Sequence, residues 1–130
     1  MKKRLLAALC AGSSVALGAC ERAADPEGCF LPYIPPSVTV TVQDSVTGAN
    51  VLAGSTLVLR NSAGVADSVT VEAQDFPILS ASLGYGATGI FSLTVRHAGY
   101  AQWARGGIEV KQERCGARTE RVDVRLRPAP

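Results

Sequence analysis

The clearest structural signal in the chain is the stretch TGIFSLTVRH, which occupies residues 88–97. Phe91, Leu93 and Val95 alternate here with small or polar residues. Apolar residues at every second position are typical of a β-strand that buries one face, and β-branched and aromatic types favour the extended backbone. A turn signal, Gly99, follows directly. The stretch therefore predicts a strand whose apolar side belongs to a protein core.

The same period of two recurs on both sides of this strand. Valine alternates with threonine or glutamine over residues 38–43, and apolar residues alternate with charged ones over residues 118–127. Residues 76–83 predict either a short strand or an irregular crossing, because Pro77 cannot donate a ladder hydrogen bond. Further strands are expected at residues 55–60, 65–73 and 101–112, the last with a bulge at Gly106-Gly107 or divided there. Six to eight strands without a helical pattern predict one all-β domain, a β-sandwich.

The first twenty residues have a different character. Residues 2–4 are basic, residues 5–19 are apolar or small, and the segment ends in Leu17-Gly18-Ala19-Cys20. A basic start followed by a short apolar run is typical of a signal peptide. The ending resembles the lipobox of bacterial lipoproteins, which has an aliphatic residue and two small residues before a cysteine. This resemblance implies that residues 1–19 are removed and that Cys20 is lipidated; the alternative is an ordinary secretory signal with a chance cysteine.

Lipidation would decide the location of the protein. Two or more acyl chains on Cys20 form a stable anchor, so the membrane is an expected partner through the N-terminal lipid. Glu21, where an aspartate would favour inner-membrane retention, points to the outer membrane. Of the 13 basic residues, three belong to the removable segment, so those remaining are fewer than the 11 acidic residues. A near-neutral domain gives no reason to expect a nucleic-acid partner.

The cysteines outside this segment predict a disulfide. Cys29 and Cys115 remain once the signal and the lipidated residue are set aside. An exported protein lies in an oxidising compartment, so we expect these two to pair, the alternative being two free buried thiols. Residues 20–36 contain four prolines and are expected to form a tether between the lipid and the domain at residues 37–128.

Three stretches resemble the carboxypeptidase regulatory-like domain family. These are VQDSVTGANV at residues 42–51, GIFSLTVRHAGY at 89–100 and IEVKQERCGARTERVDVRLRP at 108–128. The resemblance implies a seven-stranded prealbumin-like sandwich with Greek-key connections, of a kind that usually serves as a structural or binding appendage. The function expected is therefore that of a non-enzymatic structural or interaction module at the cell envelope. A lipoprotein that binds a carbohydrate or peptide ligand is the alternative, and a hydrolase ranks third.

Aromatic side chains are the candidate ligand-binding residues. Trp103, Tyr85 and Tyr100 can stack on a sugar ring, as in carbohydrate-binding sandwiches, although packing at the core or at a strand edge is the simpler interpretation. They suggest contact with an envelope glycan or an envelope protein. His97 is the only histidine and lies beside a turn, so we expect an exposed loop residue and no catalytic residues.

Other motifs point to no cofactor and no metal. Residues 84–89 match G-x-G-x-x-G, but a strand pattern follows where a dinucleotide site needs a helix. Asp44 and Asp75 are loop carboxylates without the spacing of a calcium site. The row of Arg121, Arg125 and Arg127 is interrupted by Asp123, which is more typical of a solvated face than of a partner contact.

Overall fold

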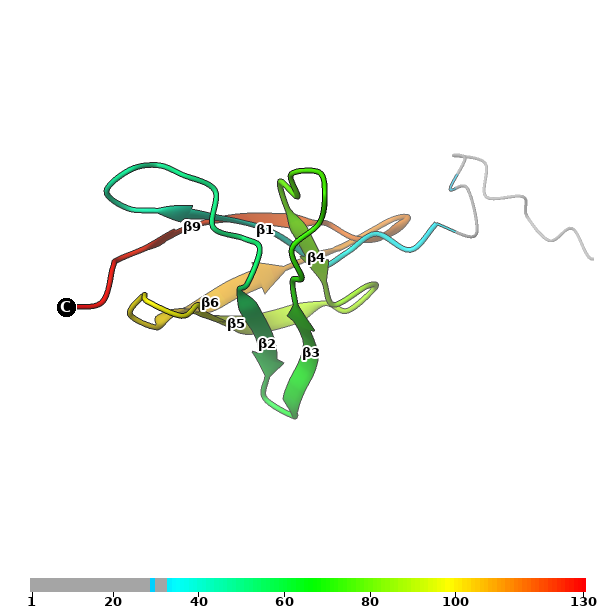
Figure 1. Cartoon of the computed structure of the whole chain (residues 1–130). Coiled ribbons are helices and arrows are strands. Elements are labelled where there is room, and N and C mark those ends of the chain that lie inside the picture. The colour runs from blue at the N-terminus through cyan, green and yellow to red at the C-terminus, as the bar shows by residue number, and fades with distance from the viewer. Residues whose placement is uncertain (1–28, 30–32) are drawn as a thin grey trace, which may run out of the picture.

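The computed structural model describes Cys29 and residues 33–130, so the expected signal peptide and most of the tether lie outside the described residues. The described part is all-β and contains no helix (Figure 1). Two main sheets have the strand orders β4-β1-β9 and β3-β2-β5-β6, and β7 and β8 form a separate two-stranded ribbon. The strands are β1 (Val38–Asp44), β2 (Thr56–Asn61), β3 (Gly64–Thr70), β4 (Ala81–Leu83), β5 (Gly89–Arg96), β6 (Trp103–Val110), β7 (Gln112–Glu113), β8 (Gly116–Ala117) and β9 (Glu120–Leu126).

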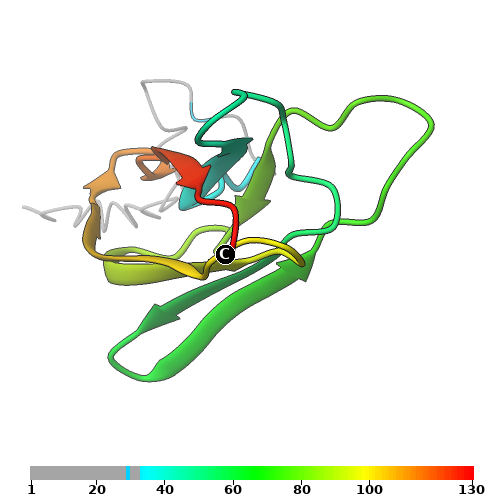
Figure 2. The ribbon, with the colours of Figure 1, turned by 60° about the vertical axis from the view of Figure 1, so that its left-hand side comes forward.

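The two main sheets lie face to face as a sandwich. Figure 2 shows β1, β4 and β9 in one layer and the four-stranded sheet in the other. The connections β1–β2, β3–β4, β4–β5 and β6–β9 each pass from one sheet to the other. The predicted all-β sandwich is confirmed, and its two sheets together contain the expected seven strands.

The core consists of the apolar positions that the alternation indicated. Phe91, Leu93 and Val95 of β5 are at most 1% exposed, while their neighbours Ser92 and Arg96 face solvent. Removing such side chains from water is the main favourable term in folding, about 25 cal/mol per Å² of apolar surface. The other sheet contributes a matching set of buried residues: Val38, Val40, Val42, Leu83, Val122, Val124 and Leu126.

Strand β1 pairs with β9 in parallel over its whole length. The register runs from Val38 opposite Glu120 to Asp44 opposite Leu126. In the same register Thr41 lies opposite Asp123. Because side chains alternate between faces along a strand, every second pair in this ladder points away from the core.

Three features refine the expected strand pattern. Residues 71–80 form a long connection that projects from the sandwich (Figure 2), and β4 begins only at Ala81, so the crossing is irregular up to that point. The predicted strand at residues 101–112 is mainly the undivided β6, Trp103–Val110, and Gln112 already belongs to β7. Two residues of β6 lie opposite Ser92 where the register shifts, which confirms the bulge at Gly106-Gly107. The β7–β8 ribbon is an element that the alternation did not indicate. No helix in the described part of the chain is long and apolar enough to cross a membrane.

The predicted disulfide is present. Cys29 is bonded to Cys115, with 5.3 Å between the two Cα atoms. Cys115 lies between β7 and β8, so the bond joins the segment before β1 to the ribbon that precedes β9.

Candidate functional site

The outer face of the β4-β1-β9 sheet presents a ladder of polar side chains. Thr41 and Gln43 of β1 lie beside Asp123 and Arg125 of β9. The Thr41 hydroxyl donates a hydrogen bond of 2.7 Å to Asp123 Oδ1. Val40 and Val124, on the opposite faces of the same strands, are buried in the core. The alternation that builds the core therefore also places these four polar side chains together in solvent.

A hollow of about 400 Å³ lies over this ladder. Asn50 borders the hollow, and its Nδ2 donates a hydrogen bond of 2.7 Å to the Ile78 carbonyl oxygen. This bond fastens the connection between β3 and β4 beside the sheet, where Leu79 forms an apolar wall and is 72% exposed. The hollow is lined by Thr41, Val42, Gln43, Asn50, Leu79, Asp123 and Arg125.

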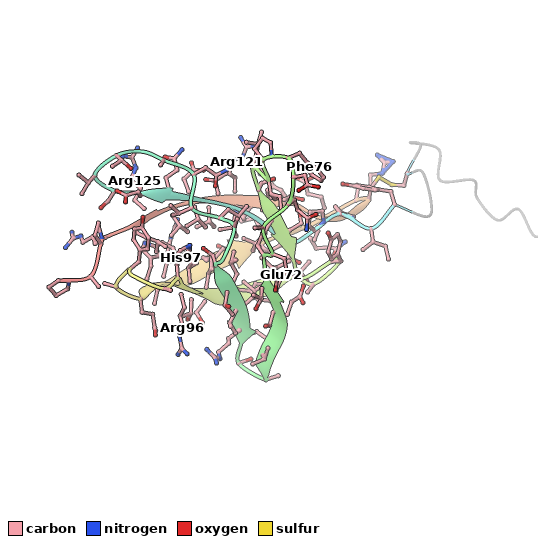
Figure 3. All side chains as sticks on the ribbon, viewed as in Figure 1. Glu72, Phe76, Arg96, His97, Arg121 and Arg125 are labelled. Atoms are coloured by element: carbon pink, nitrogen blue, oxygen red, sulfur yellow. A yellow bond between two sulfur atoms is a disulfide. The ribbon has the colours of Figure 1, made fainter. Side chains whose placement is uncertain are left out.

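A second hollow, of about 430 Å³, lies on the other side of Arg125. Trp103 at the start of β6 is half-buried against the core and also lines this hollow. The remaining lining residues are Ala101, Gln102, Ala104, Arg125 and Arg127. We call the two hollows, which share Arg125, the Arg125 surface. Figure 3 shows Arg121 and Arg125 on the outward side of this sheet, away from Arg96.

The chemistry of the Arg125 surface suits a polar ligand with a flat face. An indole ring can stack on a sugar ring or on a peptide group. Guanidinium groups bind carboxylates and phosphates with two hydrogen bonds in a fixed geometry. Asp123, Gln43 and Asn50 add amide and carboxylate oxygens that accept hydrogen bonds from hydroxyl groups.

The three predicted aromatic residues do not share a hollow. Tyr85 lies in the connection before β5, whereas Trp103 pairs with Val95 near the far end of that strand. Tyr100 is half-buried, and its hydroxyl donates a hydrogen bond of 2.7 Å to Asp44 Oδ2. Trp103 alone lines a hollow of the Arg125 surface, and no tyrosine joins it there.

Asp44 is engaged in the turn that follows β1. Its Oδ1 accepts hydrogen bonds from the backbone N–H groups of Val46, at 2.7 Å, and Thr47, at 2.9 Å. The Thr47 bond, followed by those from Tyr100 and Val46, lowers the pKa of Asp44 below its ordinary value of 3.8. The same carboxylate raises the pKa of Tyr100 above 10.0. Both carboxylate oxygens thus fasten the turn, and within residues 33–130 no cluster of three or more potential metal ligands occurs.

His97 is held by backbone carbonyl groups. Its Nδ1 lies 2.7 Å from the Ala98 oxygen and its Nε2 lies 3.0 Å from the Ala53 oxygen. The ring also meets Tyr100 edge to face, with centroids 5.1 Å apart. A general base needs a ring nitrogen directed at the substrate, and here both nitrogens contact the main chain. The geometry fits a histidine that fastens the turn before Tyr100.

Several residues of the Arg125 surface escaped the sequence interpretation. The strand pattern identified Arg125 as an outward residue, but nothing indicated that Thr41 of β1 lies beside Asp123. The pairing of strands that are about 80 residues apart depends on the register, and alternation alone does not encode it. Leu79 was hidden in a stretch whose structure the pattern left open.

Two comparisons with known proteins found no match. No protein-family model matches the chain. No curated protein matches the sequence with significance either. The functional interpretation therefore depends on the residues themselves.

Proposed function

We propose that the protein is a cell-envelope lipoprotein, anchored through an acylated Cys20, whose sandwich serves as a non-enzymatic interaction module. The observation that carries the proposal is the ending Leu17-Gly18-Ala19-Cys20 after a basic start and a short apolar run. Each methylene group of an acyl chain that enters the bilayer contributes about 0.8 kcal/mol to membrane binding, so two or more acyl chains hold a protein stably on a bilayer. Glu21 favours the outer membrane as the location.

The disulfide supports export. Bonds of this kind persist in oxidising compartments and are rare in the cytosol. The pair Cys29–Cys115 joins segments 86 residues apart, so it constrains nearly the whole domain. A small domain of this kind is stabilised where thiols are oxidised, as in the periplasm or at the cell surface.

The contacts of His97 and Asp44 support a non-enzymatic role. A hydrolase of the serine type needs a histidine that faces both a nucleophile and a carboxylate. The His97 nitrogens contact main-chain oxygens, and the Asp44 carboxylate accepts hydrogen bonds from its own turn and from Tyr100. The sandwich carries the Arg125 surface instead of a catalytic site, and we expect the protein to contact an envelope partner through this surface.

Lipidation is tested by replacing Cys20. Cells that produce the wild-type chain or the Cys20→Ser variant are fed an alkyne analogue of palmitate. We expect the wild type to incorporate the label and to sediment with membranes, and Cys20→Ser to lose the label and to yield no mature form in the membrane pellet. Cys10→Ser, a change in the segment that would be removed, is the matched control and should behave as the wild type. Mature Cys20→Ser in the pellet, or an unlabelled wild type, contradicts the proposal.

A ligand-binding role is the second candidate, and Trp103 beside Arg125 and Arg127 is the observation that favours it. Trp103 is the only tryptophan in the chain, so its fluorescence reports on this hollow alone. An oligosaccharide of galacturonic acid is a suitable probe because it combines flat rings with carboxylates. We expect it to change the fluorescence, a neutral galactose oligosaccharide to act more weakly, and Arg125→Ala to weaken binding by roughly tenfold.

The control for this titration is Arg60→Ala. Arg60 is exposed on β2 of the other sheet, so its loss should leave binding unchanged. A fluorescence response that is equal in the two variants, or absent in the wild type, counts against a ligand site at Trp103.

A further inference from the structure

One end of the sandwich carries a group of exposed apolar side chains. Tyr33, Ile34 and Tyr85 are 70%, 59% and 59% exposed. They lie where residues 33–36 approach the domain and where the chain passes from β4 to β5 (Figure 1). The C-terminus lies at the opposite end of the sandwich (Figure 1). Large apolar side chains gathered on one end mark a surface that meets another phase or partner.

Hydrogen bonds fix these side chains on the domain. The Gly86 N–H donates to the Pro35 carbonyl oxygen at 3.0 Å, so the two apolar segments are joined. The Ser37 hydroxyl contacts the Gly84 carbonyl oxygen, and the Thr119 hydroxyl donates to the Pro36 oxygen at 2.6 Å. Pro35, Pro36 and Ser37 are therefore fastened to the domain, and Tyr33 and Ile34 directly precede this fastened segment, with Ile34 next to Gly86.

Basic side chains accompany the apolar group at this end. Residues 111–118, which connect β6 to β9 through the ribbon, include the exposed Lys111, Arg114 and Arg118. Glu113 is the only acidic residue in residues 111–118, and its Oε1 lies 3.8 Å from Arg118 Nε. Tyrosine and aliphatic side chains beside lysine and arginine are the combination that proteins place at the boundary between lipid and water.

The disulfide makes the connection from this end to Cys20 short. Cys29 is bonded to Cys115 on the ribbon, so only the chain from residue 20 to residue 29 is available as a leash. Even fully extended, this leash reaches roughly 30 Å. An acylated Cys20 would therefore keep the ribbon end, and with it Tyr33, Ile34 and Tyr85, close to the membrane.

We propose that this end of the sandwich rests on the bilayer, with Tyr33, Ile34 and Tyr85 in the headgroup region and Lys111 and Arg118 beside anionic lipids. The inference rests on the proposed acylation of Cys20. A single orientation follows from it: the turn after β1 that contains Val46, at the opposite end, and the Arg125 surface along the side are left to face the compartment. A partner would thus reach the Arg125 surface without displacing the protein from the membrane.

Depth-dependent quenching tests the orientation. The lipidated full-length protein is placed in vesicles of phosphatidylcholine and phosphatidylglycerol that carry brominated acyl chains. In a Trp103→Phe background, one variant carries Tyr85→Trp and the matched control carries Val46→Trp, at a position that is 79% exposed in the turn after β1. We expect bromolipid to quench tryptophan at residue 85 at least severalfold more than at residue 46. Lys111→Glu with Arg118→Glu should reduce this quenching on anionic vesicles.

Equal quenching at the two positions overturns the inference. It is also overturned if tryptophan at residue 85 is not quenched although the protein floats with the vesicles; this result would favour a protein partner for this end. The mass of the N-terminal peptide separates this failure from that of the proposed function. An unmodified Cys20 removes the anchor and the inference together. Hydrogen exchange on the wild-type chain gives a check without variants: residues 84–89 should be slowed by vesicles and residues 45–50 should not.

Discussion

At the scale of single residues, Asp44 fastens the turn that leads out of β1. Its carboxylate accepts two backbone hydrogen bonds and one from Tyr100, which lies 56 residues further along the chain. The turn is thereby linked to the end of β5, where His97 meets the Tyr100 ring. The sequence indicated a turn at Thr47-Gly48 but gave no sign of the Tyr100 bond, because that contact depends on how the two sheets are placed.

Asp44→Asn tests this link through its pH dependence. The pKa of Asp44 is lowered in the folded protein, so the stability that the carboxylate contributes is complete above about pH 3.8 and is lost as the pH falls through the folded value. We expect the variant to melt several degrees below the wild type at pH 7, and the difference to close below about pH 3.8. Circular dichroism melts across this range provide the measurement. Asp75→Asn, on an exposed connection, is the control, and a constant difference at every pH would contradict the assignment.

At the scale of elements, the connection from β4 to β5 shows why a sequence motif can mislead. Residues 84–89 match a nucleotide-binding pattern, yet Gly89 already begins β5, a strand where a dinucleotide site needs a helix. Gly84 is buried, with a φ of 69°. A Cβ atom at this position would lie 2.8 Å from Leu59 Cδ2 and 3.2 Å from Ser37 Cβ. The glycine is required by close packing between this connection, β2 and the segment before β1.

Gly84→Ala should therefore destabilise the protein more than its backbone angle explains. A left-handed conformation costs alanine about 1–2 kcal/mol, and crowding in a packed site adds about 1–3 kcal/mol. Gly48→Ala is a matched control, because Gly48 has a φ of 73° and nothing within 4 Å of the added Cβ. Urea unfolding of both variants measures the difference. If both variants lose the same free energy of unfolding, the Leu59 side chain moves aside without an energetic cost and the packing argument is wrong.

Alternation along the chain predicted which residues face the core, and Phe91, Leu93, Val95 and Val124 are buried as expected. It could not predict that β1 and β9 pair in parallel, since the period of two describes faces and not partners. The outward residues of β9 and Trp103 could therefore be named in advance, but not that Thr41 and Gln43 of β1 lie beside that row of β9 residues. The ribbon of β7 and β8 was also missed, because two-residue strands are too short to show a period.

At the scale of the whole molecule, the bond between Cys29 and Cys115 closes a loop of 86 residues around the sandwich. Cross-linking such a loop restricts the unfolded chain, and loss of a native disulfide from a small secreted domain typically costs about 2–5 kcal/mol. The bond also limits how far the domain can move from Cys20. Without it, the first bond of the chain to the domain is the one at Pro35, so the ribbon end is held less closely.

The Cys29→Ser, Cys115→Ser double variant is expected to fold, because the hydrogen bonds of Pro35, Pro36 and Ser37 to the neighbouring connections remain. The variant should unfold at a lower temperature than the oxidised wild type. Its free energy of unfolding, compared at one temperature, should be lower by roughly 2–5 kcal/mol. A reductant should lower the melting temperature of the wild type to that of the variant and leave the variant unchanged, which isolates the bond from the effect of the two serines. A wild type indifferent to reductant, with its thiols shown to be reduced, would mean that contacts of the ribbon alone hold residue 29 against the sandwich.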